Sequence, residues 1–220
     1  MHFLKKNING SPFLGIFCAV SDKLALVPTS ISKKEETEIA NALRVKVIKT
    51  TIANSSLLGV MAALFDNKIV VGQMIEKSEK KFLEEKGIEI ISFREPTAFG
   101  NLVAFNENHG IASTLLSKNA VKEMEAFFGV PIEQKDIAGS NLVGACVEVT
   151  GKAFIVNPKV NEKEFEFLEK AFGVPGVATT ANYGDRFVGN DIVANSFGAL
   201  IGSITTTHEM IRIDEAFRRD

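Results

Sequence analysis

The chain has 220 residues, 45% hydrophobic and 24% charged, a composition typical of a globular protein with a substantial core. Its 25 basic and 27 acidic side chains give a formal net charge of −2. A protein that holds nucleic acid chiefly through phosphates is expected to carry a basic excess, so this balance argues against that class. If the protein works beside RNA, protein contacts should supply most of its binding.

No apolar run approaches the roughly 18 residues that a membrane-spanning helix needs. The N-terminal stretch contains Lys5, Lys6 and Asn7 and lacks the apolar core of a signal peptide. We therefore expect a cytoplasmic protein that does not enter a membrane.

An apolar pair followed by glycine recurs about every 44 residues and divides the chain into five units. The copies are Phe13-Leu14-Gly15, Leu57-Leu58-Gly59, Leu142-Val143-Gly144 and Phe187-Val188-Gly189, with Leu102-Val103-Ala104 as a variant that replaces only the glycine. A fixed period of this size indicates repeats that cannot bury their apolar faces alone.

Each unit is expected to begin with two antiparallel strands. In the first unit an apolar run at 16–20 precedes the polar turn 21–23 and a second apolar run at 24–27. Asn, Asp and Gly recur in the corresponding turns of the other units and tolerate the positive φ of tight hairpins. The second strands of the later units are expected at 69–71, 111–115, 153–156 and 199–201.

A helix and a third strand are expected to complete each unit. Apolar residues at helical spacing mark the helices, as at Phe165, Leu168 and Phe172. Capping-box pairs mark the starts and glycines mark the ends: Ser32 with Glu35, Asn161 with Glu164, Thr206 with Glu209, and Gly87, Gly129 and Gly173. Third strands are expected at 45–52, 88–93, 130–137 and 174–178.

The fifth unit lacks a third strand, because the chain stops at Asp220 directly after its helix. A strand-like stretch at 2–8 is left over, and we expect it to complete the fifth unit and close a ring without exposed sheet edges. The predicted fold is thus a single-domain α/β ring, 1–220, with repeats at 9–52, 53–96, 97–137, 138–178 and 179–220, the last completed by 1–8. The helices disfavour a propeller of four-stranded blades, and a doubly wound sheet would not explain the period.

Four segments in this order resemble the translation initiation factor 6 family, and the resemblance covers the whole chain. They are 52–59 (IANSSLLG), 98–102 (AFGNL), 139–144 (GSNLVG) and 205–209 (TTTHE). The chain also stops after the fifth helix, as archaeal members do. The resemblance implies the pentein fold, a five-bladed α/β propeller built as a pseudo-fivefold ring of ββαβ repeats.

The resemblance also implies a function. Family members bind the large ribosomal subunit, next to a ribosomal protein beside the sarcin–ricin loop and some rRNA, and block premature joining of the small subunit. Their release involves a translational-GTPase-like factor and a homologue of the Shwachman–Diamond protein. A rigid body needs only a standard interface, about 800 Å² per partner, to act in this steric way. A ring of this kind needs no partner copy, so we expect a monomer.

The segments before the glycines should open on one face of the ring, because each enters an equivalent strand. Phe99, Gly100 and Asn101 match the family's contact site and are the first candidates for ribosome binding. The other candidates are Asn54, Ser55, Val60, Arg186 and Phe187. The alternative is structural: Asn and Ser often cap turns through their own backbone, and the apolar column often lies in a core.

A second hypothesis is an enzyme, because other proteins of this ring fold modify guanidinium groups with a cysteine nucleophile and a histidine. Here Cys18 and Cys146 are expected as buried thiols in equivalent apolar strands, away from the histidines at 2, 109 and 208. No phosphate-binding glycine loop, zinc spacing or HExxH motif is present. We expect neither an enzyme nor a cofactor or metal site. A ring scaffold unrelated to ribosomes is the third hypothesis.

Overall fold

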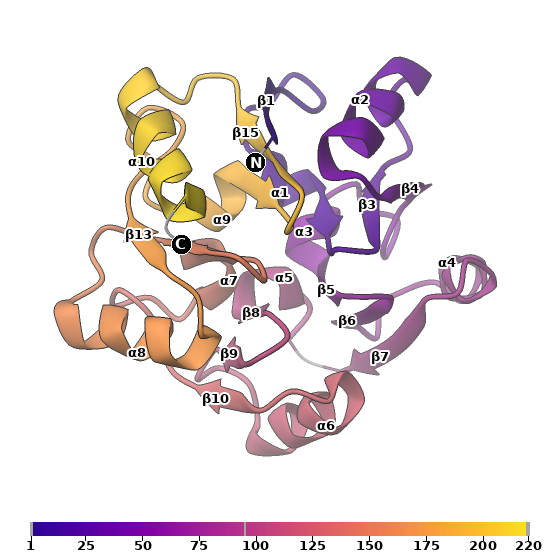
Figure 1. Ribbon diagram of the computed structural model, residues 1–220. Helices are drawn as coiled ribbons and strands as arrows, with labels where there is room; N and C mark the ends of the chain where they lie inside the picture. Colours follow the sequence, from indigo (N-terminus) through magenta and orange to yellow (C-terminus); the bar gives the residue numbers. More distant parts are fainter. Residues whose placement is uncertain (1, 95, 219–220) are drawn as a thin grey trace.

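The computed structural model describes residues 2–94 and 96–218 (Figure 1). Five three-stranded sheets are arranged about a common axis, and long helices lie at the periphery. In the first sheet, β2 (Ala19–Val20) pairs antiparallel with β3 (Leu24–Pro28), and β3 pairs parallel with β4 (Lys46–Thr50). The mixed α/β repeat that the period predicts is confirmed.

The next three sheets repeat this order of strands. They consist of β5 (Ala62–Phe65), β6 (Lys68–Gly72) and β7 (Glu89–Phe93); β8 (Val103–Phe105), β9 (Gly110–Ala112) and β10 (Ile132–Gln134); and β11 (Val147–Val149), β12 (Phe154–Val156) and β13 (Gly176–Ala178).

The fifth sheet joins the two ends of the chain. Strands β14 (Ile192–Ala194) and β15 (Gly198–Gly202) form its hairpin, and β1 (His2–Lys6) pairs parallel with β15, His2 opposite Gly198. The prediction that the N-terminal stretch completes the last unit is therefore confirmed. Because β1 and β15 lie far apart in sequence, this pairing fastens the fifth repeat to the first.

Each repeat carries one long helix between its second and third strands, except that α10 ends the fifth. These helices are α2 (Lys33–Leu43), α4 (Lys77–Glu85), α6 (Lys118–Phe128), α8 (Glu162–Phe172) and α10 (Thr207–Arg218). The capping boxes Ser32 with Glu35 and Asn161 with Glu164 are present, and Gly129 and Gly173 end their helices in the left-handed conformation, as predicted.

The glycines of the repeated pattern do not lie in strands. Each belongs to a one-turn helix that precedes the first strand: α1 (Leu14–Phe17), α3 (Leu58–Met61), α5 (Phe99–Leu102), α7 (Val143–Cys146) and α9 (Val188–Asp191). The predicted strand at 16–20 therefore begins only at Ala19, and Cys146 is helical. The third copy was also misplaced, because Gly100, not Ala104, occupies the glycine position of its repeat.

These glycines form a circuit of close contacts near the axis. A side chain on any one of them would collide with the carbonyl oxygen of the corresponding glycine in the preceding repeat. The order of the contacts is Gly15 to Gly189, Gly59 to Gly15, Gly100 to Gly59, Gly144 to Gly100, and Gly189 to Gly144. The one-turn helices can pack directly against one another because glycine has no side chain at these positions.

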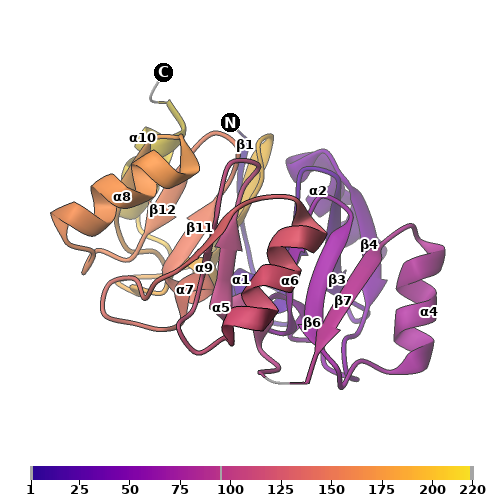
Figure 2. The ribbon, with the colours of Figure 1, turned by 90° about the horizontal axis from the view of Figure 1, so that it is seen from below.

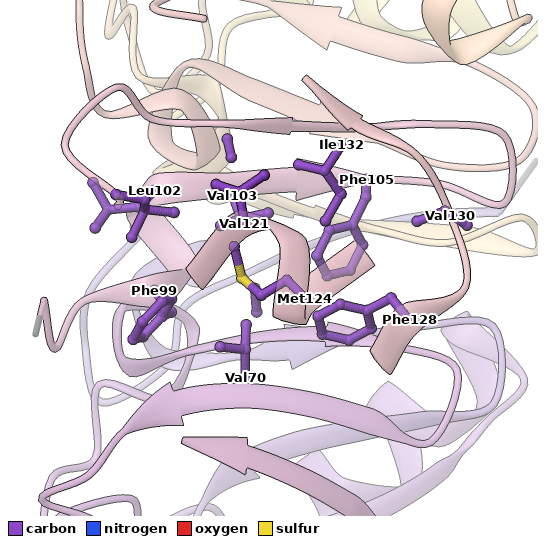
Figure 3. Close-up of a cluster of buried hydrophobic side chains, with 13 residues drawn as sticks. Val70, Phe99, Leu102, Val103, Phe105, Val121, Met124, Phe128, Val130 and Ile132 are labelled. Carbon is purple, nitrogen blue, oxygen red and sulfur yellow. The ribbon is translucent and has the colours of Figure 1, made fainter. Parts of the chain in front are cut away.

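The apolar core lies between neighbouring repeats. In one cluster Ala63 and Val70 of the second repeat pack with Phe99, Met124 and Phe128 of the third. Figure 3 shows Val70 beside Met124 of α6, with Phe99 on one side and Phe128 on the other. The other clusters likewise join residues of successive repeats. No helix within the described residues is long and apolar enough to cross a membrane.

The glycine circuit predicts a large cost for added side chains. Gly100→Ala should lower the free energy of unfolding by about 3 kcal/mol or more, because the new methyl group meets rigid backbone. Gly129→Ala is the matched control, since open space surrounds Gly129 and only its left-handed conformation costs about 1 kcal/mol. Urea unfolding of both variants checks this. Equal losses would show that the close approach does not limit stability.

Candidate functional site

A tight turn precedes the one-turn helix in four of the repeats. Its central residues have positive φ, and the residues on either side of the turn form an isolated antiparallel bridge. The bridges are Ile8–Ser11, Ile52–Ser55, Ile137–Ser140 and Ala181–Asp185. These turns follow the carboxyl ends of the third strands, so they lie at the same end of their sheets.

The side chain of the polar residue after each turn accepts a backbone N–H two residues on, just before the short helix begins. The Ser55 hydroxyl accepts the N–H of Leu57 at 3.1 Å, and the Asp185 carboxylate accepts the N–H of Phe187 at 2.7 Å. Ser55 is thus engaged with its own backbone, as the structural alternative for these polar residues supposes. Asn54, by contrast, is exposed at the tip of its turn.

Glu79 of α4 holds the second of these turns in place. Its carboxylate accepts the N–H groups of Ala53 at 2.8 Å and Asn54 at 2.9 Å, together with the Thr51 hydroxyl. Burial raises the pKa of Glu79, but these hydrogen bonds and that of the Glu76 N–H outweigh it, so the pKa lies below its usual value. The carboxylate stabilises a left-handed turn that Ala53 and Asn54 would otherwise adopt at a cost.

Glu209 of α10 repeats this arrangement in the fifth repeat. It accepts the N–H groups of Gly184 at 2.8 Å and Tyr183 at 3.2 Å, and the Thr180 hydroxyl at 2.7 Å. Its other bonds come from Thr206, with which it forms a capping box. The Thr-Thr-x-x-Glu segment, which is part of the family resemblance, therefore starts helix α10. Its glutamate also holds the turn at Tyr183 and Gly184 in place.

Large apolar side chains are exposed at this end of the sheets. Tyr183 is 81% exposed at the tip of its turn, and Met74 is 64% exposed just after β6. We define the turn face by these two residues and by Asn54, Leu57, Leu115, Arg186 and Ile204. Met74, Leu115 and Ile204 follow second strands, which run parallel to the third strands and end on the same side.

The structure brings most of the predicted contact residues to this end of the molecule. Asn54 and Arg186 are exposed, while Ser55 and Phe187 are half-buried. Val60 and Asn101 occupy the same position of their one-turn helices and are also half-buried.

Two predicted residues have a different place. Phe99 is fully buried, as are Leu14, Leu58, Val143 and Val188 at the same position of the other short helices. The Phe99 side chain therefore packs between repeats in the core, and the assignment of Phe99 to the ribosome-binding segment stays a prediction. Gly100, the other residue, belongs to the glycine circuit and lines the axis.

Four exposed residues of the turn face were not predicted as contacts from the sequence: Met74, Leu115, Tyr183 and Ile204. Met74 and Ile204 stand two residues after Gly72 and Gly202, at the ends of equivalent strands. A large apolar residue between a strand end and a helix cap has little to pack against, and this signal could have identified both.

An axial cavity of about 100 Å³ lies at the centre of the ring of short helices, lined by the five glycines of the circuit. A second pocket of about 210 Å³ lies among the hairpin turns and shares lining residues such as Val20 and Phe105 with the first; the two together are called the axial channel. Glu148 lies on its wall and accepts the Ala194 N–H at 2.6 Å. Burial raises the pKa of Glu148 to about 8, against the effect of this hydrogen bond.

The channel does not bring together the groups of a cysteine hydrolase. Cys18 lines it, but burial raises the pKa of this thiol to about 12, and no histidine is among the described lining residues. Cys146 is also buried, with a raised pKa. Within 2–94 and 96–218, no three His, Cys, Asp or Glu side chains are grouped so as to hold a metal ion.

The Glu79 hydrogen bonds predict a pH-dependent contribution to stability. Glu79→Gln should lower the free energy of unfolding by about 2 kcal/mol at pH 7, because an amide N–H₂ would face backbone donors. Since the folded pKa lies below 4.5, the contribution is present above pH 4.5 and is lost as the pH falls through the folded value. Denaturant unfolding between pH 3 and 8 measures it.

Glu164→Gln is the control for this prediction, because Glu164 occupies the same capping-box position in α8 but, among the described residues, accepts no hydrogen bond from a neighbouring turn. If the two variants lose equal stability, the turn contacts of Glu79 contribute nothing.

Glu148 should have the opposite pH dependence. Its pKa rises from 4.5 to about 8 on folding, so wild-type stability falls between these values as pH increases. Glu148→Gln removes the buried charge and should be more stable than wild type at pH 9, by more than about 1 kcal/mol. This advantage should shrink toward pH 5, and melting curves at both pH values test it. An advantage independent of pH would contradict the assignment of the pKa.

Comparison with known proteins gives the relationship of this chain. The model of the eIF-6 family matches residues 3–216. Translation initiation factor 6 of Pyrococcus horikoshii is 33% identical over 223 residues, covering 98% of both chains. The protein of the same name from Pyrococcus abyssi is 34% identical, and the match covers 98% of both chains. That from Methanocaldococcus jannaschii is 32% identical, and the match covers 97% of this chain and 96% of the relative.

Solved structures share the fold at low sequence identity. The N-terminal domain of ArgZ, a cyanobacterial arginine dihydrolase, matches with a TM-score of 0.57 over 84% of this chain and 76% of that one, at 11% identity. A second structure of this domain gives 0.53, also at 11% identity. These likenesses show the pentein fold alone. The sequence relatives are initiation factors, which agrees with the prediction of a non-enzymatic protein, and the family match shows that this chain belongs to the eIF-6 family.

Proposed function

We propose that this protein is a translation initiation factor that binds the large ribosomal subunit and prevents the small subunit from joining. The observation that carries the proposal is the turn face, in a chain whose relatives are named translation initiation factor 6. Such a surface places exposed apolar side chains among polar and charged ones, as protein interfaces do.

The mechanism is steric and depends on rigidity. Glu79 and Glu209 fix the turns that carry Asn54 and Tyr183, so the backbone of these turns loses little freedom on binding. An exposed tyrosine is a frequent anchor of protein interfaces. A surface of about 800 Å² on each partner is enough for stable binding.

The partner proposed for the turn face is a large-subunit protein near the sarcin–ricin loop. A net charge of −2 favours protein over rRNA as the main contact, with Arg186 available for a minor phosphate contact. Release would require a translational-GTPase-like factor and a Shwachman–Diamond-type protein. We further propose that the protein is a cytoplasmic monomer and that 1–220 forms one domain of five repeats.

Sedimentation with purified ribosomal subunits tests this function. The protein should cosediment with the large subunit and not with the small one, and it should reduce the formation of joined ribosomes. Binding to neither subunit, or to the small subunit alone, would contradict the proposal.

Variants of the turn face test the choice of surface. Tyr183→Ala combined with Met74→Ser should weaken large-subunit binding at least about tenfold, because interface anchors contribute about 2 kcal/mol or more. The melting temperature should stay close to that of wild type, since both side chains are exposed. Ile211→Ser, which changes an exposed apolar residue of α10, is the control and should bind normally. Normal binding by the double variant would place the interface elsewhere.

A further inference from the structure

A second concave surface lies at the opposite end of the sheets from the turn face. It is a groove of about 440 Å³ between the β14–β15 hairpin, the end of α2 and the end of α10. Its described lining residues are His2, Arg44, Lys152, Ser196, Phe197 and Phe217. In Figure 2 strand β1 and helix α10 lie near the upper edge of the molecule, and the short helices α5, α7 and α9 lie lower down.

The groove concentrates positive charge in a protein of net charge −2. Two of its described lining residues, Arg44 and Lys152, are positively charged at pH 7, and none is acidic. Arg44 and Lys152 form no ion pair with any residue in 2–94 or 96–218, although basic side chains of α2, α4 and α10 do pair with carboxylates. The nearby acids Asp22 and Glu107 line the axial mouth instead, and Asp22 is engaged by the Ser196 N–H at 2.7 Å.

Arg44 occupies a position where other repeats have glycine. It ends α2 in the left-handed conformation, with φ of 55°, whereas Gly129 and Gly173 end α6 and α8 in that conformation. A side chain is disfavoured there, and glycine would relieve the strain. The positive charge suits the end of a helix, but a strained residue at the rim of a groove also points to a role in binding.

Phe197 gives the groove an aromatic surface. The residue is 39% exposed, and its N–H donates to the Asn195 side chain at 3.0 Å. Asn195 in turn donates to the carbonyl oxygen of Leu43 at 2.8 Å, so the hairpin is attached to the end of α2 beside Arg44. The Asn195 side chain therefore links the backbone of Phe197 to the backbone of Leu43, the residue before Arg44.

We propose that this groove binds a nucleotide unit, with its phosphate at Arg44, Lys152 and His2 and its base stacked on Phe197. Cationic side chains beside an exposed aromatic ring are the combination by which proteins hold single-stranded nucleic acid. The volume lies within the range of small-molecule sites, about 300–1,000 Å³. The unit is supplied either by a free nucleotide or by a strand of single-stranded RNA. The site lies away from the turn face, so it is a second activity beyond subunit binding.

Fluorescence titration of the full chain tests the proposal and separates the two sources. The probes are a fluorescent nucleoside triphosphate and a labelled six-residue oligouridylate, with a labelled oligoglutamate peptide as the acidic control. We expect saturable binding of at least one nucleotide probe, weakening with salt, and none of the peptide. A site for RNA strands would favour the oligonucleotide, and a site for free nucleotides the triphosphate.

Three variants decide whether the groove is responsible. Phe197→Ala should weaken binding about tenfold through lost stacking. Arg44→Gly should weaken it and reduce the salt dependence by about one unit of the log–log slope, without lowering the melting temperature. Lys163→Ala, at an exposed lysine of α8, should bind as wild type. Absence of binding by both nucleotide probes, equal binding of the peptide, or normal binding by the Phe197 and Arg44 variants would overturn the proposal.

Discussion

The structure depends on the approach of five glycines around the axis. Each one-turn helix lies so close to the next that a single methyl group would strike a backbone carbonyl oxygen. This spacing fixes where the first strand of every repeat begins, and therefore where the carboxyl ends of the second and third strands emerge. The positions of the turn face, of the axial channel and of the groove at the opposite end of the sheets all follow from that arrangement.

Buried polar groups hold the outer parts of the repeats to this centre. Glu79 and Glu209 bind the turns that lead into α3 and α9, where the backbone is left-handed. At the hairpin end, Asn195 binds the carbonyl oxygen of Ser21 in the first repeat. In the fifth repeat Asn182 donates to Asp191, whose burial raises its pKa to about 7. These bonds join segments that the apolar core alone would leave free to shift.

Much of the repeat could be predicted from the sequence, because its signals are local. Asn161 with Glu164 identifies the start of α8, Gly173 identifies its end, and the unassigned N-terminal strand identifies the partner of β15. The pattern of the third repeat was placed at Leu102-Val103-Ala104, but Ala98-Phe99-Gly100 offers a second apolar pair in the same segment. Only the contacts between repeats show that Gly100 is the equivalent glycine. The burial of Phe99 likewise depends on contact between repeats.

The candidate site was less predictable, because its shape comes from contacts between distant segments. Asn54 and Arg186 could be assigned to one face from their places before the glycines. The hydrogen bonds from the Ala53 and Asn54 N–H groups to Glu79 join residues more than twenty positions apart, so no local sequence pattern predicts them. The turn that carries Tyr183 is also one residue longer than its counterpart after Ile52, a difference that the repeat pattern does not predict.

We propose that the turn face of this eIF-6 family member contacts the large ribosomal subunit. Photo-cross-linking from a benzophenone amino acid at position 183, with purified subunits, tests this contact. We expect cross-links to a large-subunit protein from position 183 and few from position 211 on the outer side of α10. Cross-links from position 211 but not from position 183 would contradict it.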